Sequence, residues 1–67
     1  MTPAWISFQR RCALRMPGFL KNAILGRREA LESEGWHARD PEARRWLQDS
    51  LAALTALARE LGQAVPA

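Results

Sequence analysis

The segment DPEARRWLQDSLAALTALARELG, residues 40–62, carries its own helix start, helix end and apolar face. Asp40 is a favoured N-cap residue, and Pro41 suits the first helical position. Gly62 suits the left-handed residue that often follows a helix. The segment therefore predicts a helix over residues 41–61, about 31 Å long at 1.5 Å per residue.

The apolar face of this helix is broad. At 100° per residue, its apolar side chains fall within an arc of about 160°. A chain of 67 residues has few other apolar side chains to cover such a face. We therefore predict that oligomerisation or a partner protein completes the fold. The residues of this helix expected at that interface are Trp46, Leu47, Leu51, Leu54, Leu57 and Leu61.

Two further helices are predicted before it. Residues 19–34 place apolar side chains on one face and precede Gly35, a suitable helix end. Residues 4–16 form a shorter amphipathic segment that ends before Pro17. Because the link between the last two helices is short, they should form an antiparallel hairpin. The expected apolar side of the first helix comprises Trp5, Phe8, Cys12, Ala13 and Met16.

Composition also favours an all-α class, because alanine, leucine, arginine and glutamate dominate and all favour helices. The expected fold is one domain over residues 1–67, an antiparallel helical hairpin plus a short N-terminal helix. Residues 63–67 are expected to fray. The single cysteine, Cys12, excludes an internal disulfide, and the single histidine, His37, leaves no zinc-binding set within one chain. Self-association is therefore the expected additional source of stability.

The sequence predicts no enzyme, cofactor or metal site, because it contains no acid–base cluster, metal-ligand spacing or glycine-rich phosphate loop. His37 is interpreted as a loop residue that caps a carbonyl group. Cys12 is interpreted as a small core residue, the alternative being a thiolate activated by nearby arginines. A lone thiol suits the cytoplasm, and no apolar run is long enough to cross a membrane.

Charge is distributed unevenly along the chain. Residues 1–28 carry six basic residues and no acid, whereas residues 29–67 carry four basic and seven acidic residues. The basic half is interpreted as a solvated face that pairs with an acidic neighbouring subunit, as a nucleic-acid surface, or as a membrane-adsorbing helix. The apolar side of the first helix is too narrow to favour the membrane. The residues expected to contact nucleic acid are Arg10, Arg11, Arg15, Lys21, Arg27 and Arg28.

A helix-turn-helix formed by the last two helices is a more specific form of the nucleic-acid hypothesis. The segment SEGWHARD, residues 33–40, is longer than the usual turn of roughly three to four residues. The last helix is also longer than a recognition helix requires. The pattern therefore gives this hypothesis little support.

Arg27 lies near the centre of an otherwise apolar helix face, which leaves two interpretations. The side chain either reaches past the apolar surface to solvent, or pairs with a carboxylate and sets the register between helices or subunits. Three tryptophans are many for this length, and tryptophan is common in small cores and in interfaces. Trp46 is expected in the core. Trp5, Trp36 and Arg27 are further candidates for a contact between chains.

We therefore predict a non-catalytic small helical protein that binds and regulates another protein through an amphipathic helical surface, as a homodimer. Its size and composition resemble those of bacterial or phage accessory proteins in general. The alternative is a small DNA- or RNA-binding regulator that uses the basic N-terminal half. Membrane association is not expected.

Overall fold

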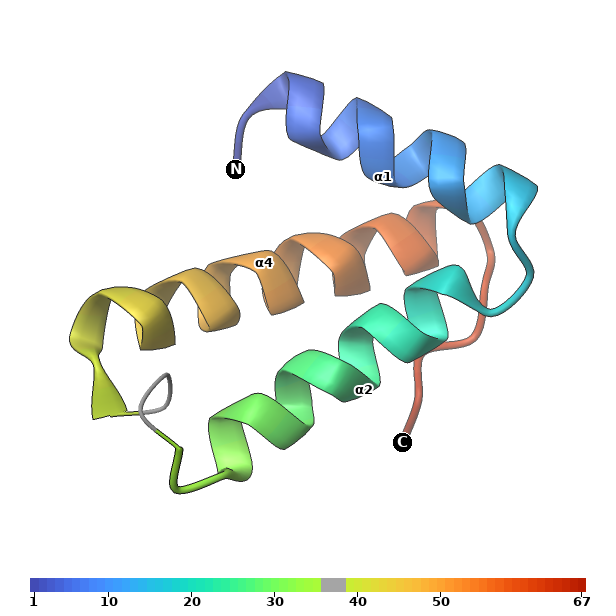
Figure 1. The fold of residues 1–67 in the computed structure, drawn as a ribbon. Coiled ribbons are helices and arrows are strands. Elements are labelled where there is room, and N and C mark those ends of the chain that lie inside the picture. The colour runs from blue at the N-terminus through green and yellow to red at the C-terminus, as the bar shows by residue number, and fades with distance from the viewer. Residues whose placement is uncertain (36–38) are drawn as a thin grey trace.

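The computed structural model describes residues 1–35 and 39–67, which contain three helices and no strand (Figure 1). The helices are α1 (Pro3–Arg15), α2 (Phe19–Glu32) and α4 (Pro41–Glu60). Their bounds lie within two residues of those expected from the sequence. The predicted all-α class is therefore confirmed for the described residues, none of whose helices has the length and hydropathy needed to cross a bilayer.

The α4 helix begins at the predicted residue, Pro41, and ends at Glu60, one residue before the predicted end. The Asp40 carboxylate accepts a hydrogen bond of 3.1 Å from the backbone N–H of Glu42. Pro41 occupies the first helical position, where a missing N–H costs nothing. Gly62 has a φ of +69°, which side-chain-bearing residues rarely adopt. These capping residues determine where the longest helix of the fold begins and ends.

The α1 helix begins at a cap of the same kind. The Thr2 hydroxyl accepts a hydrogen bond of 3.1 Å from the backbone N–H of Trp5. A short turn then joins α1 to α2 through Gly18, whose φ is +79°. This turn folds α1 back over the hairpin, so that α1 runs in the same direction as α4 (Figure 1).

The helices α2 and α4 run antiparallel and enclose most of the core (Figure 1). Leu20 and Ile24 of α2 pack against Leu54 of α4, and each of these side chains is at most 1% exposed. The helix α1 adds Ala13 to this cluster and also buries Gln9. The hairpin is therefore the main body of the fold, and α1 packs on it alongside α4 (Figure 1).

The leucine face of α4 is already covered by its own chain. Leu54 is fully buried, Leu57 is 5% exposed and Leu47 is 7% exposed. Leu51 and Leu61 are partly buried against the core. The prediction that Leu47, Leu54 and Leu57 need a second polypeptide is therefore wrong, because these side chains are buried within the monomer.

The orientation of α1 also differs from the expected one. Gln9 and Ala13 face the core, whereas Phe8 is 53% exposed and Met16 is 47% exposed. Trp5 is partly buried against the core. The helix is thus rotated away from its expected apolar side, and this rotation leaves two large apolar side chains at the surface.

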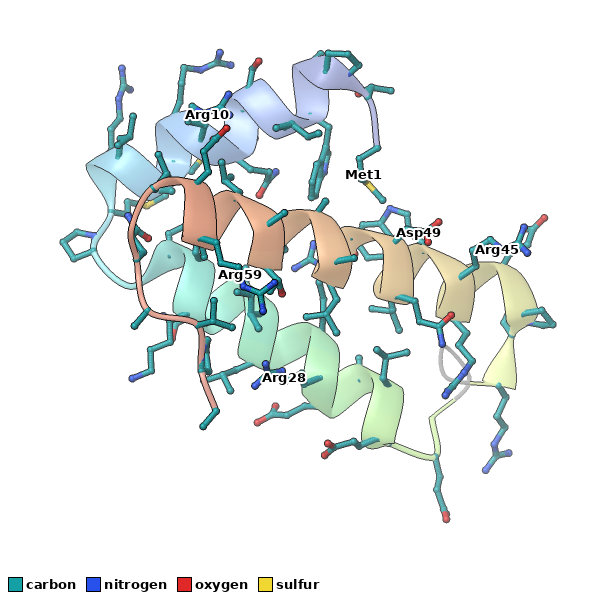
Figure 2. All side chains as sticks on the ribbon, turned by 180° about the vertical axis from the view of Figure 1, so that it is seen from behind. Met1, Arg10, Arg28, Arg45, Asp49 and Arg59 are labelled. Atoms are coloured by element: carbon teal, nitrogen blue, oxygen red, sulfur yellow. The ribbon has the colours of Figure 1, made fainter. Side chains whose placement is uncertain are left out.

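The tail after α4 folds back toward α2 instead of fraying. A guanidinium nitrogen of Arg28 donates hydrogen bonds to the backbone oxygens of Pro66, at 2.7 Å, and Ala67, at 3.0 Å (Figure 2). Val65 packs against the core, and Gln63 N–H donates to the Ala58 carbonyl at 2.8 Å. Arg28 therefore holds the tail in place.

Candidate functional site

The described residues contain no group of three histidine, cysteine, aspartate or glutamate side chains placed to hold a metal ion. Two shallow recesses on the described surface, one beside Leu57 and one beside Pro41, are partly open to solvent. The features with functional potential are therefore a polar junction between α2 and α4, a groove beside α1, and the exposed side of α1.

Arg27 forms the polar junction between α2 and α4. Its Nε donates a hydrogen bond of 2.8 Å to the hydroxyl of Ser50, and a terminal nitrogen donates to the Ala23 carbonyl at 3.2 Å. Its guanidinium carbon lies 5.1 Å from the ring centroid of Trp46, which is cation–π geometry. Among the described residues, a hydroxyl, a carbonyl and an indole ring surround the cation, so the interpretation that pairs Arg27 with a carboxylate is not met within this part of the chain.

The polar atoms at this junction are satisfied in spite of their burial. Ser50 is fully buried, and its hydroxyl also donates to the Leu47 carbonyl at 3.2 Å. Burial lowers the pKa of the Arg27 guanidinium below its usual value, because desolvation penalises the charged form. Arg27 thus belongs to the packing between two helices of one chain. Fewer of its N–H groups are therefore available to contact a partner protein or nucleic acid.

Trp46 stands at the edge of this junction and is 48% exposed. The expectation that it lies in the core is therefore wrong. Figure 1 shows α1 beside the C-terminal part of α4, whereas Trp46 belongs to the first two turns of α4. Trp36 and His37, which the sequence analysis also singled out, lie outside the described residues.

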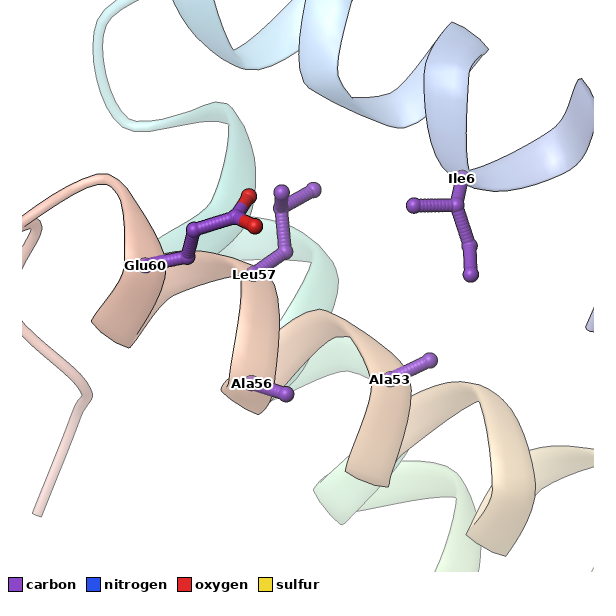
Figure 3. A pocket seen from close by; sticks show the side chains of 5 residues that line it. All are labelled: Ile6, Ala53, Ala56, Leu57 and Glu60. Carbon is purple, nitrogen blue, oxygen red and sulfur yellow. The ribbon is translucent and has the colours of Figure 1, made fainter. Parts of the chain in front are cut away.

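A groove of about 180 Å³ runs between α1 and α4 (Figure 3). Its base and sides are largely apolar. The Glu60 carboxylate at its rim accepts a hydrogen bond from Arg10 of α1, and the two side chains form an ion pair. The pair ties α1 to the end of α4. The lining residues are Ile6, Ala53, Ala56, Leu57 and Glu60.

Among the described residues, the side of α1 that points away from the hairpin exposes two large apolar side chains, and we call it the α1 outer face. Phe8 is 53% exposed and Leu14 is 67% exposed. The guanidinium of Arg11 lies 5.9 Å from the ring centroid of Phe8. This face contains no acidic residue. Its members, all exposed, are Ala4, Ser7, Phe8, Arg11, Leu14 and Arg15.

The six basic residues of the N-terminal half divide into two sets. One set makes contacts within the chain, to Glu60, to the α4 junction and to the tail. Its members are Arg10, Arg27 and Arg28. The other set is exposed around α1 and the start of α2. Its members are Arg11, Arg15 and Lys21. A nucleic-acid surface in this half would therefore depend mainly on the second set.

Comparison with known proteins returned no match, whether to a protein-family model, a curated protein or a solved structure. The functional assignment therefore depends on the surfaces described above. Of these, the α1 outer face was the least visible in the sequence, because Leu14 falls outside the expected apolar side of its helix. The acid-free composition of residues 1–28 was the signal that pointed to this region.

Proposed function

We propose that this chain is a non-catalytic helical protein that binds and regulates another protein through the α1 outer face. The observation that carries this proposal is the exposure of Phe8 and Leu14 on one helix. Large apolar side chains on a helix surface typically dock into an apolar groove of a partner. The sequence analysis assigned partner binding to the leucine face of α4. Because that face is largely buried within the chain, we assign partner binding to α1 instead.

The positive charge of the α1 outer face indicates which charges the partner surface should carry. Arg11 and Arg15 flank the apolar side chains, and no acid lies among residues 1–28. A matching surface would combine an apolar groove with carboxylates at its rim, because such charges speed association and favour the correct orientation. Arginine also retains its charge at an interface and forms paired hydrogen bonds with carboxylates.

We propose in addition that the binding unit is a homodimer. The core is small, and the chain has one cysteine and therefore no internal disulfide. Small domains of this kind commonly gain stability by self-association. A lone thiol also supports the cytoplasm as the proposed location.

Affinity capture from the native host tests the binding proposal. The tagged chain is compared with the variant Phe8→Ser/Leu14→Ser, in extracts with and without nuclease. Because both side chains are exposed, the variant should remain folded, with stability changed by about 0.5 kcal/mol or less per site. The matched control, Gln48→Ser/Ala52→Ser, changes two exposed positions of α4.

The expected result is a defined protein that the wild type and the control retain and that Phe8→Ser/Leu14→Ser loses. Nuclease should not change this pattern. The proposal fails if the captured protein is retained by the Phe8→Ser/Leu14→Ser variant while circular dichroism shows that the variant is folded.

A DNA- or RNA-binding regulator remains the second candidate, supported by the exposure of Arg11, Arg15 and Lys21. Binding to phosphates would weaken steeply with salt, by roughly 0.9 logarithmic units per tenfold salt for each phosphate contact. A gel-shift series with nonspecific duplex separates the two candidates. A steep salt dependence that Arg11→Gln/Arg15→Gln reduces would favour nucleic acid over a protein partner.

A further inference from the structure

The helix α1 contributes little to the core of the fold. Its buried residues are Gln9, at 8% exposed, and Ala13, at 5% exposed, so one is polar and the other is small. Trp5 packs against the core but remains partly exposed. Among the described residues, the largest fully buried side chains all belong to α2 and α4. They are Leu20, Ile24, Ser50 and Leu54. Because hydrophobic stabilisation scales with the apolar area removed from water, most of it comes from the hairpin.

The contact between α1 and α4 is incomplete. A groove of about 180 Å³ lies between them, with Ile6 on the α1 side and Ala53 on the α4 side (Figure 3). Closely packed helices leave little such space, so dispersion contacts are missing along this length. The Arg10–Glu60 ion pair holds α1 to the end of α4, and its two side chains are 38% and 57% exposed. An exposed pair of this kind changes an equilibrium constant by up to about fivefold.

The turn between α1 and α2 allows the two helices to move apart. Residues 16–18 are exposed, so no part of this turn is held in the core. The helix α2 has its own start at Gly18, whose carbonyl accepts a hydrogen bond of 2.9 Å from the backbone N–H of Asn22. A few loop residues of this kind are enough to absorb a change of chain direction. Departure of α1 therefore does not require α2 to unwind.

The helix α1 depends on the hairpin for its own structure. It has 13 residues, and isolated helices shorter than roughly 12–15 residues are marginal in water. Arg11 and Arg15 are also like charges four residues apart, which destabilises an isolated helix. Once α1 leaves the hairpin it loses its helix, and Phe8 and Leu14 are then no longer presented together on the α1 outer face.

We infer that α1 docks on the α2–α4 hairpin and leaves it as a cooperative unit of its own, while the hairpin stays folded. The α1 outer face exists only in the docked state. The docking equilibrium therefore sets the fraction of chains that can bind through this face. The inference gives the proposed function a means of regulation, and it rests on that function only for what the face binds.

Native-state hydrogen exchange of the full chain, followed by nuclear magnetic resonance without any partner protein, tests this inference. Relative to unstructured rates, the slowest amides of α1 should exchange at least about tenfold faster than the slowest amides of α2 and α4, because α1 opens without the hairpin. Samples are kept dilute and their mass is checked by sedimentation equilibrium, since the proposed homodimer would add protection. Equal protection of the slowest amides in the three helices would overturn the inference.

Gly26→Ala provides the decisive arm, because it strengthens α2 and leaves the docking of α1 unchanged. A Cβ atom at this position meets no atom within 4 Å. The slowest amides of α2 and α4 should exchange about two- to fivefold more slowly, while those of α1 keep their wild-type rates. Slowing of α1 by the same factor as the hairpin would show that the chain opens as one unit, and would contradict the inference.

Arg10→Gln removes the ion pair and keeps high helix propensity. Because unfolding of the hairpin includes departure of α1, this variant should speed exchange in all three helices by one factor, up to about fivefold. The matched control Arg10→Lys keeps the charge beside Glu60 and should stay within about twofold of the wild type. Unchanged exchange of α1 in Arg10→Gln would overturn the role given to the ion pair.

The exchange measurements and the capture experiment fail independently. A chain whose three helices open together overturns the docking equilibrium, even where a partner protein is captured. A chain whose α1 opens separately but which captures no partner contradicts the proposed function and leaves the docking equilibrium in place.

Discussion

The Nε atom of Arg27 lies 2.8 Å from the Ser50 hydroxyl oxygen and joins the middle of α2 to the middle of α4. Each residue interrupts the apolar face of its own helix, and the two interruptions meet in the folded chain. Since Ser50 is fully buried and also bonds the Leu47 carbonyl, a shift of either helix would leave buried polar atoms without partners. The pair therefore fixes the register of the hairpin.

Ser50→Ala is expected to lower the free energy of unfolding by about 1–2 kcal/mol, because Arg27 loses the acceptor of its Nε–H in a partly buried position. Urea unfolding followed by circular dichroism measures the change. Ala52→Ser, at an exposed position of the same helix, is the control and should change stability by about 0.5 kcal/mol or less.

Arg27→Leu combined with Ser50→Ala should restore most of the stability lost in Ser50→Ala, because removal of both polar partners leaves an apolar contact. A double-mutant cycle of the free energies of unfolding in urea gives the coupling energy, expected at about 1 kcal/mol. Strictly additive effects of the two substitutions would show that the Arg27–Ser50 bond has no energetic role.

Gly26→Ala is expected to raise the free energy of unfolding of the monomer by about 0.5–1 kcal/mol, because alanine favours the helix and the added Cβ meets no neighbour. Thermal unfolding at low concentration measures it. Gly62→Ala serves as the opposite case. Gly62 has a φ of +69°, a conformation that strains alanine. The free energy of unfolding of Gly62→Ala should therefore fall by about 1 kcal/mol.

Arg28→Ala is expected to release the tail, since this side chain bonds the backbone oxygens of Pro66 and Ala67. Amide relaxation measurements should then show increased motion for Gln63, Ala64, Val65 and Ala67 with little change in the helices. Arg59→Ala, which removes an exposed arginine of α4, is the control and should leave the tail unchanged. A tail that remains rigid in Arg28→Ala would show that Val65 packing and the Gln63–Ala58 hydrogen bond hold it without Arg28.

Leu54→Ala is expected to cost about 2–5 kcal/mol, because the side chain is fully buried between the helices. Leu14→Ala should change stability by about 0.5 kcal/mol or less, since Leu14 is 67% exposed. Urea unfolding of the two variants compares a core leucine with a surface leucine. Equal losses would contradict the division between the α4 core face and the α1 outer face.

Local signals in the sequence predicted the helices well. Asp40 and Gly62 marked the ends of α4 because capping depends on the residues at a helix end alone. The coverage of Leu54 could not be predicted in this way, since it depends on how α2 and α1 pack around α4. Nor could the exposure of Trp46, which depends on which part of α4 the other helices contact.

The candidate surfaces were harder to predict than the helices. The amphipathic pattern of α1 placed Phe8 inward, whereas the structure exposes Phe8 and buries Gln9. A helix packed on a hairpin can rotate by part of a turn about its own axis without breaking its own hydrogen bonds. The pattern therefore did not determine which side of α1 faces the core. The partner of Arg27 was also missed. The sequence pattern shows Ser50 as the one polar residue within the apolar arc of α4. Its pairing with Arg27 could not be predicted, because it depends on how α2 and α4 align in space.

The central claim is that α1 binds a partner protein while the leucines of α4 remain in the core. Nuclear magnetic resonance of the isotope-labelled chain, titrated with the captured protein, tests it most directly. The largest amide shift changes are expected at Phe8, Arg11 and Leu14, with small changes at Leu54. Changes concentrated on α4, with the amides of α1 unmoved, would contradict it.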